Sequence, residues 1–238
     1  MGGDLTTLRP MDGPAAKSAL AWWLEAGVDS LVAEEARDWF AAPASKAPLE
    51  TKAPNIKVPE PETLEALKDW LATGADLPLA GPAARRTLPH GPAEAEVMLL
   101  SEAPGSEDAA AQQPIGGAAW HLAERMLAAI GFLPQEAYSA SLSCFHAPGK
   151  KMTPAERDLC AEIALRHIRL ARPKRLILFG DGPSMALLGK RLTDARGHIH
   201  KVEGVRTIAT FHPRHLVHRP LDKALAWKDL LLLMEEEV

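Results

Sequence analysis

Val97-Met-Leu-Leu-Ser-Glu-Ala-Pro-Gly105 is the stretch of this 238-residue sequence that decides its fold. It starts as a short apolar run and ends in a turn, where Pro104 and Gly105 allow a sharp bend and a close approach of the backbone to a ligand. Further apolar runs at 137–143, 175–180 and 205–211 alternate with stretches of helical periodicity. This alternation predicts parallel strands joined by right-handed helical crossovers.

We therefore expect an α/β fold over residues 95–238, with three α/β/α layers around a four-stranded parallel sheet of order 2-1-3-4. Strands are expected at 96–101, 137–143, 175–180 and 205–211, and helices at 118–130, 154–170 and 183–188. Ligands of such sheets bind in the crevice at the carboxyl ends of the strands. The residues that follow each strand are therefore the first candidates for a functional site.

Residues 1–80 are expected to form a helical N-terminal extension. The patterns predict one or two helices within 15–40 and another over 63–71, where Leu64, Leu67 and Leu71 recur at helical spacing. Between them, the proline-rich segment 41–62 has little helical periodicity. It is interpreted as a linker or a strap on the surface.

The composition, 47% apolar, is that of a soluble protein with a sizeable core and no apolar run of membrane-spanning length. The first residues show no secretory pattern, and the two cysteines support neither a disulfide framework nor a four-cysteine metal site. A cytoplasmic location is the default expectation. The net charge is −4, yet residues 141–228 carry 17 Lys and Arg against 7 Asp and Glu. This asymmetry fits either a face for a phosphate backbone or an unevenly charged solvated surface.

Three segments at predicted strand ends carry a family pattern. They are Ser101-Glu-Ala-Pro-Gly105, the segment from Ser139 to Pro148, and Phe211-His-Pro-Arg-His-Leu216, which is followed by Lys223, Trp227, Asp229 and Leu230. In this order they resemble the uracil-DNA glycosylase superfamily, closest to the iron–sulfur-containing type four enzymes. The resemblance covers about residues 95–235.

The resemblance assigns two catalytic residues: Asp108 falls on the acid that orients the attacking water, and His212 on the imidazole that donates to the leaving base. Residues expected to bind the base are Glu102, Ala103, Ile115 and Ser141. The sequence departs from the family at several of these positions. Asp108 is a shorter acid than the family has, Ile115 replaces a stacking phenylalanine, Ser141 replaces an asparagine that reads the base edge, and Ser101 replaces a glycine.

The resemblance also implies DNA as the partner, single- or double-stranded and carrying a damaged base, and a monomeric protein that does not bind membranes. Arg214, His215 and Arg219 are expected to contact the DNA, with the loop 213–218 at the minor groove. No cofactor and no metal are expected. Phe145 falls on the third cluster cysteine and only Cys160 matches a ligand position, whereas an iron–sulfur cluster needs about four thiolates. Zinc binding by the histidines near His212 lacks a matching cysteine or acid pattern.

Two hypotheses follow for the function. The first is a DNA base-excision repair hydrolase that cleaves the N-glycosidic bond of a flipped, deaminated base, with altered or reduced specificity for uracil. The second is a catalytically inactive DNA-binding or protein-interaction paralogue. His212 also has a plainer interpretation, as a helix-capping or buried structural histidine. Gly180-Asp-Gly-Pro-Ser184 is interpreted as an ordinary strand-to-helix turn, because it lacks the lysine of a phosphate-binding loop.

Overall fold

The computed structural model describes residues 13–25 and 61–235 of the chain. The chain divides into two compact units, residues 1–51 and 52–238. In the first unit the described element is helix α1 (Gly13–Glu25), which lies within the range expected to be helical. Most of the proline-rich segment 41–62, and any helix between 26 and 40, lie outside the described residues.

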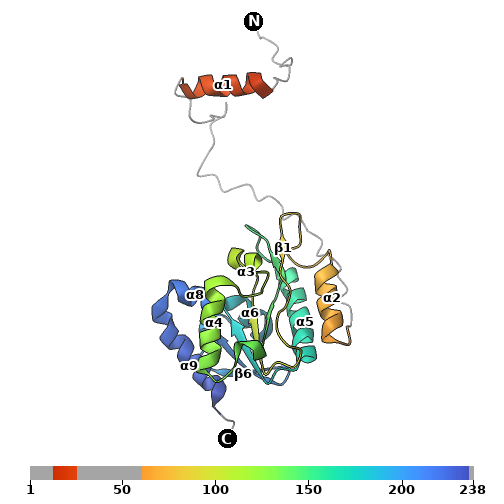
Figure 1. Cartoon of the computed structure of the whole chain (residues 1–238), viewed down its shortest axis with the longest axis vertical. Helices are drawn as coiled ribbons and strands as arrows, with labels where there is room; N and C mark the ends of the chain where they lie inside the picture. Colours follow the sequence, from red (N-terminus) through yellow and green to blue (C-terminus); the bar gives the residue numbers. More distant parts are fainter. Residues whose placement is uncertain (1–12, 26–60, 236–238) are drawn as a thin grey trace, which may run out of the picture. The chain divides into compact units, whose positions relative to one another are not determined.

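The second unit has a central sheet with helices around it (Figure 1). The sheet has five strands in the order β3-β2-β5-β7-β6. Its strands are β2 (Val97–Ser101), β3 (Ala137–Ser141), β5 (Arg175–Phe179), β6 (Ile199–Val202) and β7 (Val205–Thr210). The pairs β2–β3, β2–β5 and β5–β7 are parallel. This confirms the predicted four-stranded parallel sheet and its order 2-1-3-4. The prediction missed β6, which pairs antiparallel with β7 at the edge of the sheet.

Helices cover both faces of the sheet and make the three predicted layers. They are α2 (Leu64–Thr73), α3 (Ser106–Ala111), α4 (Gly117–Ala129), α5 (Pro154–Ala171), α6 (Asp181–Leu188), α7 (Leu192–Ala195), α8 (Pro213–His218) and α9 (Lys223–Met234). Short 3-10 turns, η1 (Pro134–Glu136) and η2 (Pro220–Asp222), precede β3 and α9, and a small ribbon pairs β1 (Arg85–Arg86) with β4 (Phe145–His146). Every helix within 13–25 and 61–235 is too short or too polar to cross a bilayer.

Alternating residues of the parallel strands fill two cores. Met98, Leu100 and Leu178 face α5, whereas Leu99 and Ile177 face α4 and α9. The strands are buried on both faces, which explains why they appear in the sequence as continuous apolar runs. Such packing fixes the direction and length of each strand. It therefore fixes where the loops at the carboxyl ends emerge.

Helix α2 belongs to the second unit, although the sequence placed it in the N-terminal extension. Thr63 caps its first turn by accepting from the Ala66 N–H. Its leucines Leu67 and Leu71 pack with Phe145 and Ile163 in a third apolar cluster. Helix α2 thus lies on the outside of α5, where it covers the segment after β3.

Candidate active site at the strand ends

The turn after β2 is held in shape by three hydrogen bonds from the segment that follows β3. The Ser143 N–H donates to the Glu102 carbonyl at 3.0 Å, and the Leu142 N–H donates to the Ser101 carbonyl at 2.9 Å. His146 Nδ1 lies 2.9 Å from the Pro104 carbonyl oxygen, so this nitrogen donates. These contacts join the first two segments of the family pattern into one rigid rim.

Asp108 anchors the continuation of this rim. It is fully buried, and its carboxylate accepts from the Gly105 N–H at 2.6 Å and from the Gly116 N–H at 2.7 Å. Arg214 of α8 forms an ion pair with the same carboxylate. A carboxylate has about four acceptor sites, and these donors occupy three of them. In this structure Asp108 thus clamps two loop segments and α8 together, and its expected role in orienting water stays a prediction.

Arg214 is therefore engaged within the protein, although it was expected to contact DNA. Its guanidinium lies so close to Gly105 that a Cβ on that glycine would come within 2.9 Å of Cζ. The arginine side chain keeps 41% of its surface exposed. A side chain at position 105 would therefore displace the Arg214 guanidinium from its present position.

His212 is the N-cap of α8, and its ring has a defined tautomer. Nδ1 accepts from the Arg214 N–H at 3.0 Å, so Nδ1 carries no proton and Nε2 carries it. Burial, with a smaller effect of the nearby Arg214 charge, lowers the pKa of His212 to about 3. The ring is neutral at pH 7. It packs edge-on against Phe179, with ring centroids 5.7 Å apart.

The capping interpretation of His212 and the catalytic one are therefore compatible. Capping uses Nδ1 alone, and no partner of Nε2 lies among the described residues. The cap fixes the ring and aims a neutral N–H donor away from the helix. Such a donor can stabilise negative charge that develops on a leaving base.

Asp229, one of the residues that match the family pattern, holds the segment that precedes His212. Asp229 is almost fully buried and accepts from Thr210 Oγ1 at 2.7 Å and from the Gly197 N–H at 3.1 Å. Arg196 pairs with it at 3.0 Å. Burial raises the pKa of Asp229 despite these partners. The residue fixes the end of β7, and with it the position of His212.

The turn from Gly180 to Gly182 lies next to both Glu102 and His212 at the carboxyl ends of the strands. A Cβ on Gly180 would lie 4.0 Å from His212 Cβ, and a Cβ on Gly182 would lie 2.5 Å from Glu102 Cδ. Gly180 and Gly182 are two residues apart, which is at most about 7 Å of chain. This turn was interpreted as ordinary from the sequence. The sequence feature that indicates its role is the pair Gly180 and Gly182 at a strand end, which lets Glu102 and His212 approach the backbone of the turn closely.

The other expected base-binding residues are placed differently. Ser141 ends β3 and is half-buried, with its Oγ 3.1 Å from Ser101 Oγ, and Ala103 is half-buried beside the third apolar cluster. Ile115 is completely buried in the core with Leu99 and Ala119. It supplies packing here, and its contact with a base stays a prediction.

The remaining expected DNA contacts lie on or next to α8. His215 stacks on Phe211 with centroids 5.0 Å apart, and its Nε2 lies 2.7 Å from Asp222 Oδ2. His215 is therefore held within the protein. Arg219 follows α8 and is exposed, and its side chain has no partner within the part of the chain that the structure describes.

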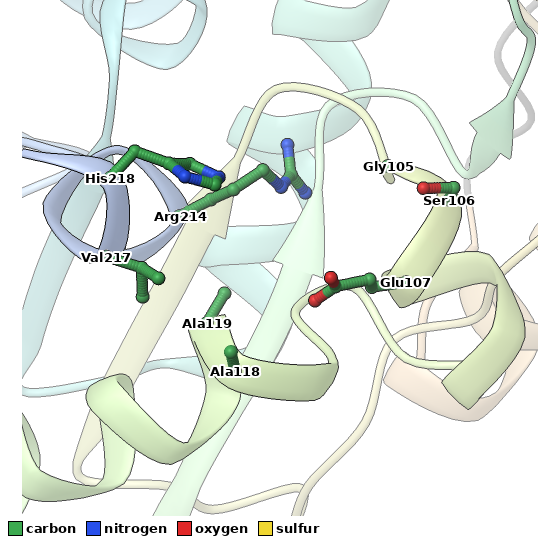
Figure 2. A pocket seen from close by; sticks show the side chains of 8 residues that line it. All are labelled: Gly105, Ser106, Glu107, Ala118, Ala119, Arg214, Val217 and His218. Atoms are coloured by element: carbon green, nitrogen blue, oxygen red, sulfur yellow. The ribbon is translucent and has the colours of Figure 1, made fainter.

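A pocket of about 280 Å³ opens beside the Asp108 clamp (Figure 2). Figure 2 shows Arg214, Val217 and His218 of α8 on one side, Glu107 on the other, and Ala118 and Ala119 of α4 below. Of the site residues named individually from the sequence, Arg214 lines it, together with Val217 and His218 of the loop 213–218. The sequence did not single out Glu107, which sits next to Asp108 but on the exposed side of α3.

The described residues do not fit an iron–sulfur cluster. Cys144 and Cys160 are buried, and burial raises their pKa values to about 11 and about 12, whereas cluster ligands must be thiolates. Cys160 Sγ lies 3.7 Å from Met152 Sδ, and Cys144 packs among the leucines of the third apolar cluster. No three His, Cys, Asp or Glu side chains within 13–25 and 61–235 gather closely enough to hold a metal ion.

Comparison with known proteins agrees with this geometry. The sequence model of the uracil DNA glycosylase superfamily matches residues 88–231. A type-4 uracil-DNA glycosylase of Archaeoglobus fulgidus is 27% identical over 141 residues, which are 55% of this chain and 71% of the relative. The type-4 uracil-DNA glycosylase of Pyrobaculum aerophilum is 26% identical over 57% of this chain and 75% of its own. The type-4 uracil-DNA glycosylase of Thermotoga maritima is 26% identical over 54% of this chain and 69% of its own. The chain belongs to the uracil-DNA glycosylase superfamily.

Proposed function

We propose that the protein is a DNA glycosylase that hydrolyses the N-glycosidic bond of a flipped, deaminated base, with altered or reduced specificity for uracil. The observation that carries this proposal is the neutral His212, whose Nε2–H has no partner within 13–25 and 61–235 while Nδ1 is fixed by the Arg214 N–H at 3.0 Å. Membership of the superfamily supports the reaction class. The altered specificity rests on Ser141 and Ile115, which replace the residues that read and stack on uracil.

In the proposed reaction, the bond between C1′ of the sugar and the base nitrogen breaks, and its electron pair leaves with the base. His212 Nε2–H donates to the departing base and stabilises the negative charge. A water oxygen then bonds to C1′, and its proton passes to solvent or to a carboxylate. Because the donor is neutral, it needs no protonation step near pH 7. The low pKa of His212 keeps it in this state across the physiological range.

The test is excision from single- and double-stranded oligonucleotides that carry uracil, hypoxanthine or xanthine, read as strand nicking after alkali. His212→Ala should slow single-turnover excision by about 10²–10³-fold, because an oriented donor acts mainly in the transition state. DNA affinity should hardly change. His121→Ala is the matched control, since His121 is an exposed histidine of α4 whose contact is with Glu124.

The native protein and the His212→Ala variant can each give a result that contradicts the proposal. If the native chain excises none of these bases while it still binds DNA, the protein is the non-catalytic paralogue. Excision by His212→Ala at the native rate would instead remove His212 from the mechanism.

A further inference from the structure

We propose that the groove between α4 and α9 is a docking site for an acidic, amphipathic helix of a partner protein. The inference is independent of the proposed catalysis, because its residues do not line the candidate active site and its ligand is a protein rather than DNA. It gives a role to Lys223 and Trp227, which match the family pattern but take no part in that site.

The first wall of the groove is one face of α4, which packs with α8 and α9 on the same side of the sheet (Figure 1). Its lining residues, Leu122, Arg125, Met126 and Ala129, have the spacing i, i+3, i+4, i+7. This spacing places side chains in one row along a helix. From Leu122 to Ala129 the helix rises by about 10 Å, which is about two turns.

The second wall is a face of α9 with the same spacing, formed by Lys223, Ala226, Trp227 and Leu230. Ala226 and Leu230 are buried, whereas Trp227 is 40% exposed, and the buried Leu216 of α8 completes the lining. An amphipathic helix binds such a groove by inserting apolar side chains that recur at this same spacing. The two walls therefore fit a helix of another protein.

The size of the groove favours a docked segment over a small molecule. Its volume is about 210 Å³. Pockets for drug-sized ligands usually measure about 300–1,000 Å³, so this groove is small for one. It suits apolar side chains of a docked helix, and an exposed tryptophan at the wall is typical of an anchor residue in a protein interface.

The charges of the lining indicate the chemistry of the partner. Arg125 and Lys223 are exposed on the two walls, and none of the described residues that line the groove is acidic. The carboxylates next to these cations in the chain, those of Glu124 and Asp222, contact histidines instead. An apolar helix face edged by Asp or Glu complements both the lining and the two cations, whereas a basic helix is repelled.

Two other occupants fit this surface less well. A phosphate backbone would pair with the two cations but would leave Trp227 and the buried apolar lining without a partner. A two-fold dimer of this chain through the groove would bring each copy of Arg125 and Lys223 against like charges. Neither occupant satisfies both the apolar and the charged parts of the groove.

The experiment measures binding of labelled synthetic peptides by fluorescence polarisation, at physiological ionic strength and without DNA. The acidic probe is a helical peptide with leucine and phenylalanine on one face and glutamate on the other. A second probe has lysine in place of every glutamate, and a third has serine in place of the apolar residues. The native protein should bind the acidic probe with a Kd of about 10–100 µM and the other two at least about 10-fold more weakly.

Four variants of α9 test whether the groove itself binds the probe. Trp227→Ala should weaken binding of the acidic probe by about 10–30-fold, as expected for a tryptophan anchor, and Lys223→Glu by about 3–10-fold. Leu225→Ala and Lys228→Glu are the matched controls, because both change exposed residues of α9 outside the groove. They should keep the native affinity within about 2-fold, since salt screens charges at a distance. If Trp227→Ala does not fold, Lys223→Glu and its control decide the test.

Several results would overturn the inference. One is equal binding of the acidic and basic probes, or binding of neither, and another is native affinity for the acidic probe in Lys223→Glu or in folded Trp227→Ala. A dimer in sedimentation that Trp227→Ala dissociates would assign the groove to a second copy of the chain. Loss of affinity for a single-stranded oligonucleotide in Trp227→Ala would assign it to the DNA interface. Excision is read separately in the alkali assay, so the two proposals can fail independently.

Discussion

Replacing Asp108 with asparagine tests whether this side chain clamps the site or takes part in the chemistry. Its carboxylate is fully buried and accepts from the Gly105 and Gly116 N–H groups and from Arg214. An amide has one oxygen, so at least one of these donors would face an NH2 group. A buried donor without an acceptor costs about 1–3 kcal/mol, and breaking a buried ion pair costs about 3–5 kcal/mol. Because Arg214 is 41% exposed, we expect the lower end of the second range, about 3 kcal/mol.

Thermal unfolding measures this loss directly. For a protein of this size, about 3 kcal/mol corresponds to a fall in Tm of about 6–12 °C. Glu107→Gln is the matched control, since it makes the same chemical change one residue earlier at an exposed position and should alter stability by less than about 1 kcal/mol. If Asp108→Asn melts with the native protein and yet slows excision by about 100-fold or more, the clamp is the wrong explanation, and Asp108 belongs to the chemistry.

Two further predictions concern protons and charges. Burial lowers the pKa of His167 to about 3. Below about pH 6.5 the unfolded chain therefore binds a proton at this residue that the folded protein does not bind. Through this residue, the free energy of unfolding should fall by about 2 kcal/mol between pH 8 and pH 5. Urea unfolding at both pH values should show a smaller fall for His167→Gln, and an equal fall would contradict the assignment. Arg219→Ala should weaken binding to all DNA sequences alike and reduce the slope of log affinity against log salt concentration by about one, without changing Tm. Arg214→Ala should instead lower Tm, because it leaves Asp108 unpaired. An unchanged salt slope for Arg219→Ala would remove it from the DNA interface.

The central sheet could be predicted because its information is local. Each parallel strand is a short apolar run, buried on both faces, and each is followed by a turn. Strand β6 was missed because Ile199-His-Lys-Val202 is only four residues long and has polar residues at its centre. The sequence feature that indicates β6 is the pair Glu203 and Gly204, which forms the turn between β6 and β7. Their φ angles of 49° and 79° suit a tight antiparallel hairpin.

The side-chain contacts of the site could not be predicted in the same way. The ion pair of Asp108 and Arg214 joins residues 106 positions apart, and nothing in the neighbourhood of either residue indicates the other. The sequence predicted a water molecule as the partner of Asp108 and DNA as the partner of Arg214. The tertiary structure pairs them with each other, because the buried carboxylate needs a counter-charge.

The contacts in the structure separate the segment that keeps the family pattern from the positions that depart from it. The segment from Phe211 to Leu230 matches most fully because its residues hold one another: Thr210 binds Asp229, and His212 caps α8 through Arg214. By contrast, the changes at positions 101 and 141 concern groups that meet at 3.1 Å. A change at either position therefore alters the surroundings of the other, on a scaffold that keeps His212 in place.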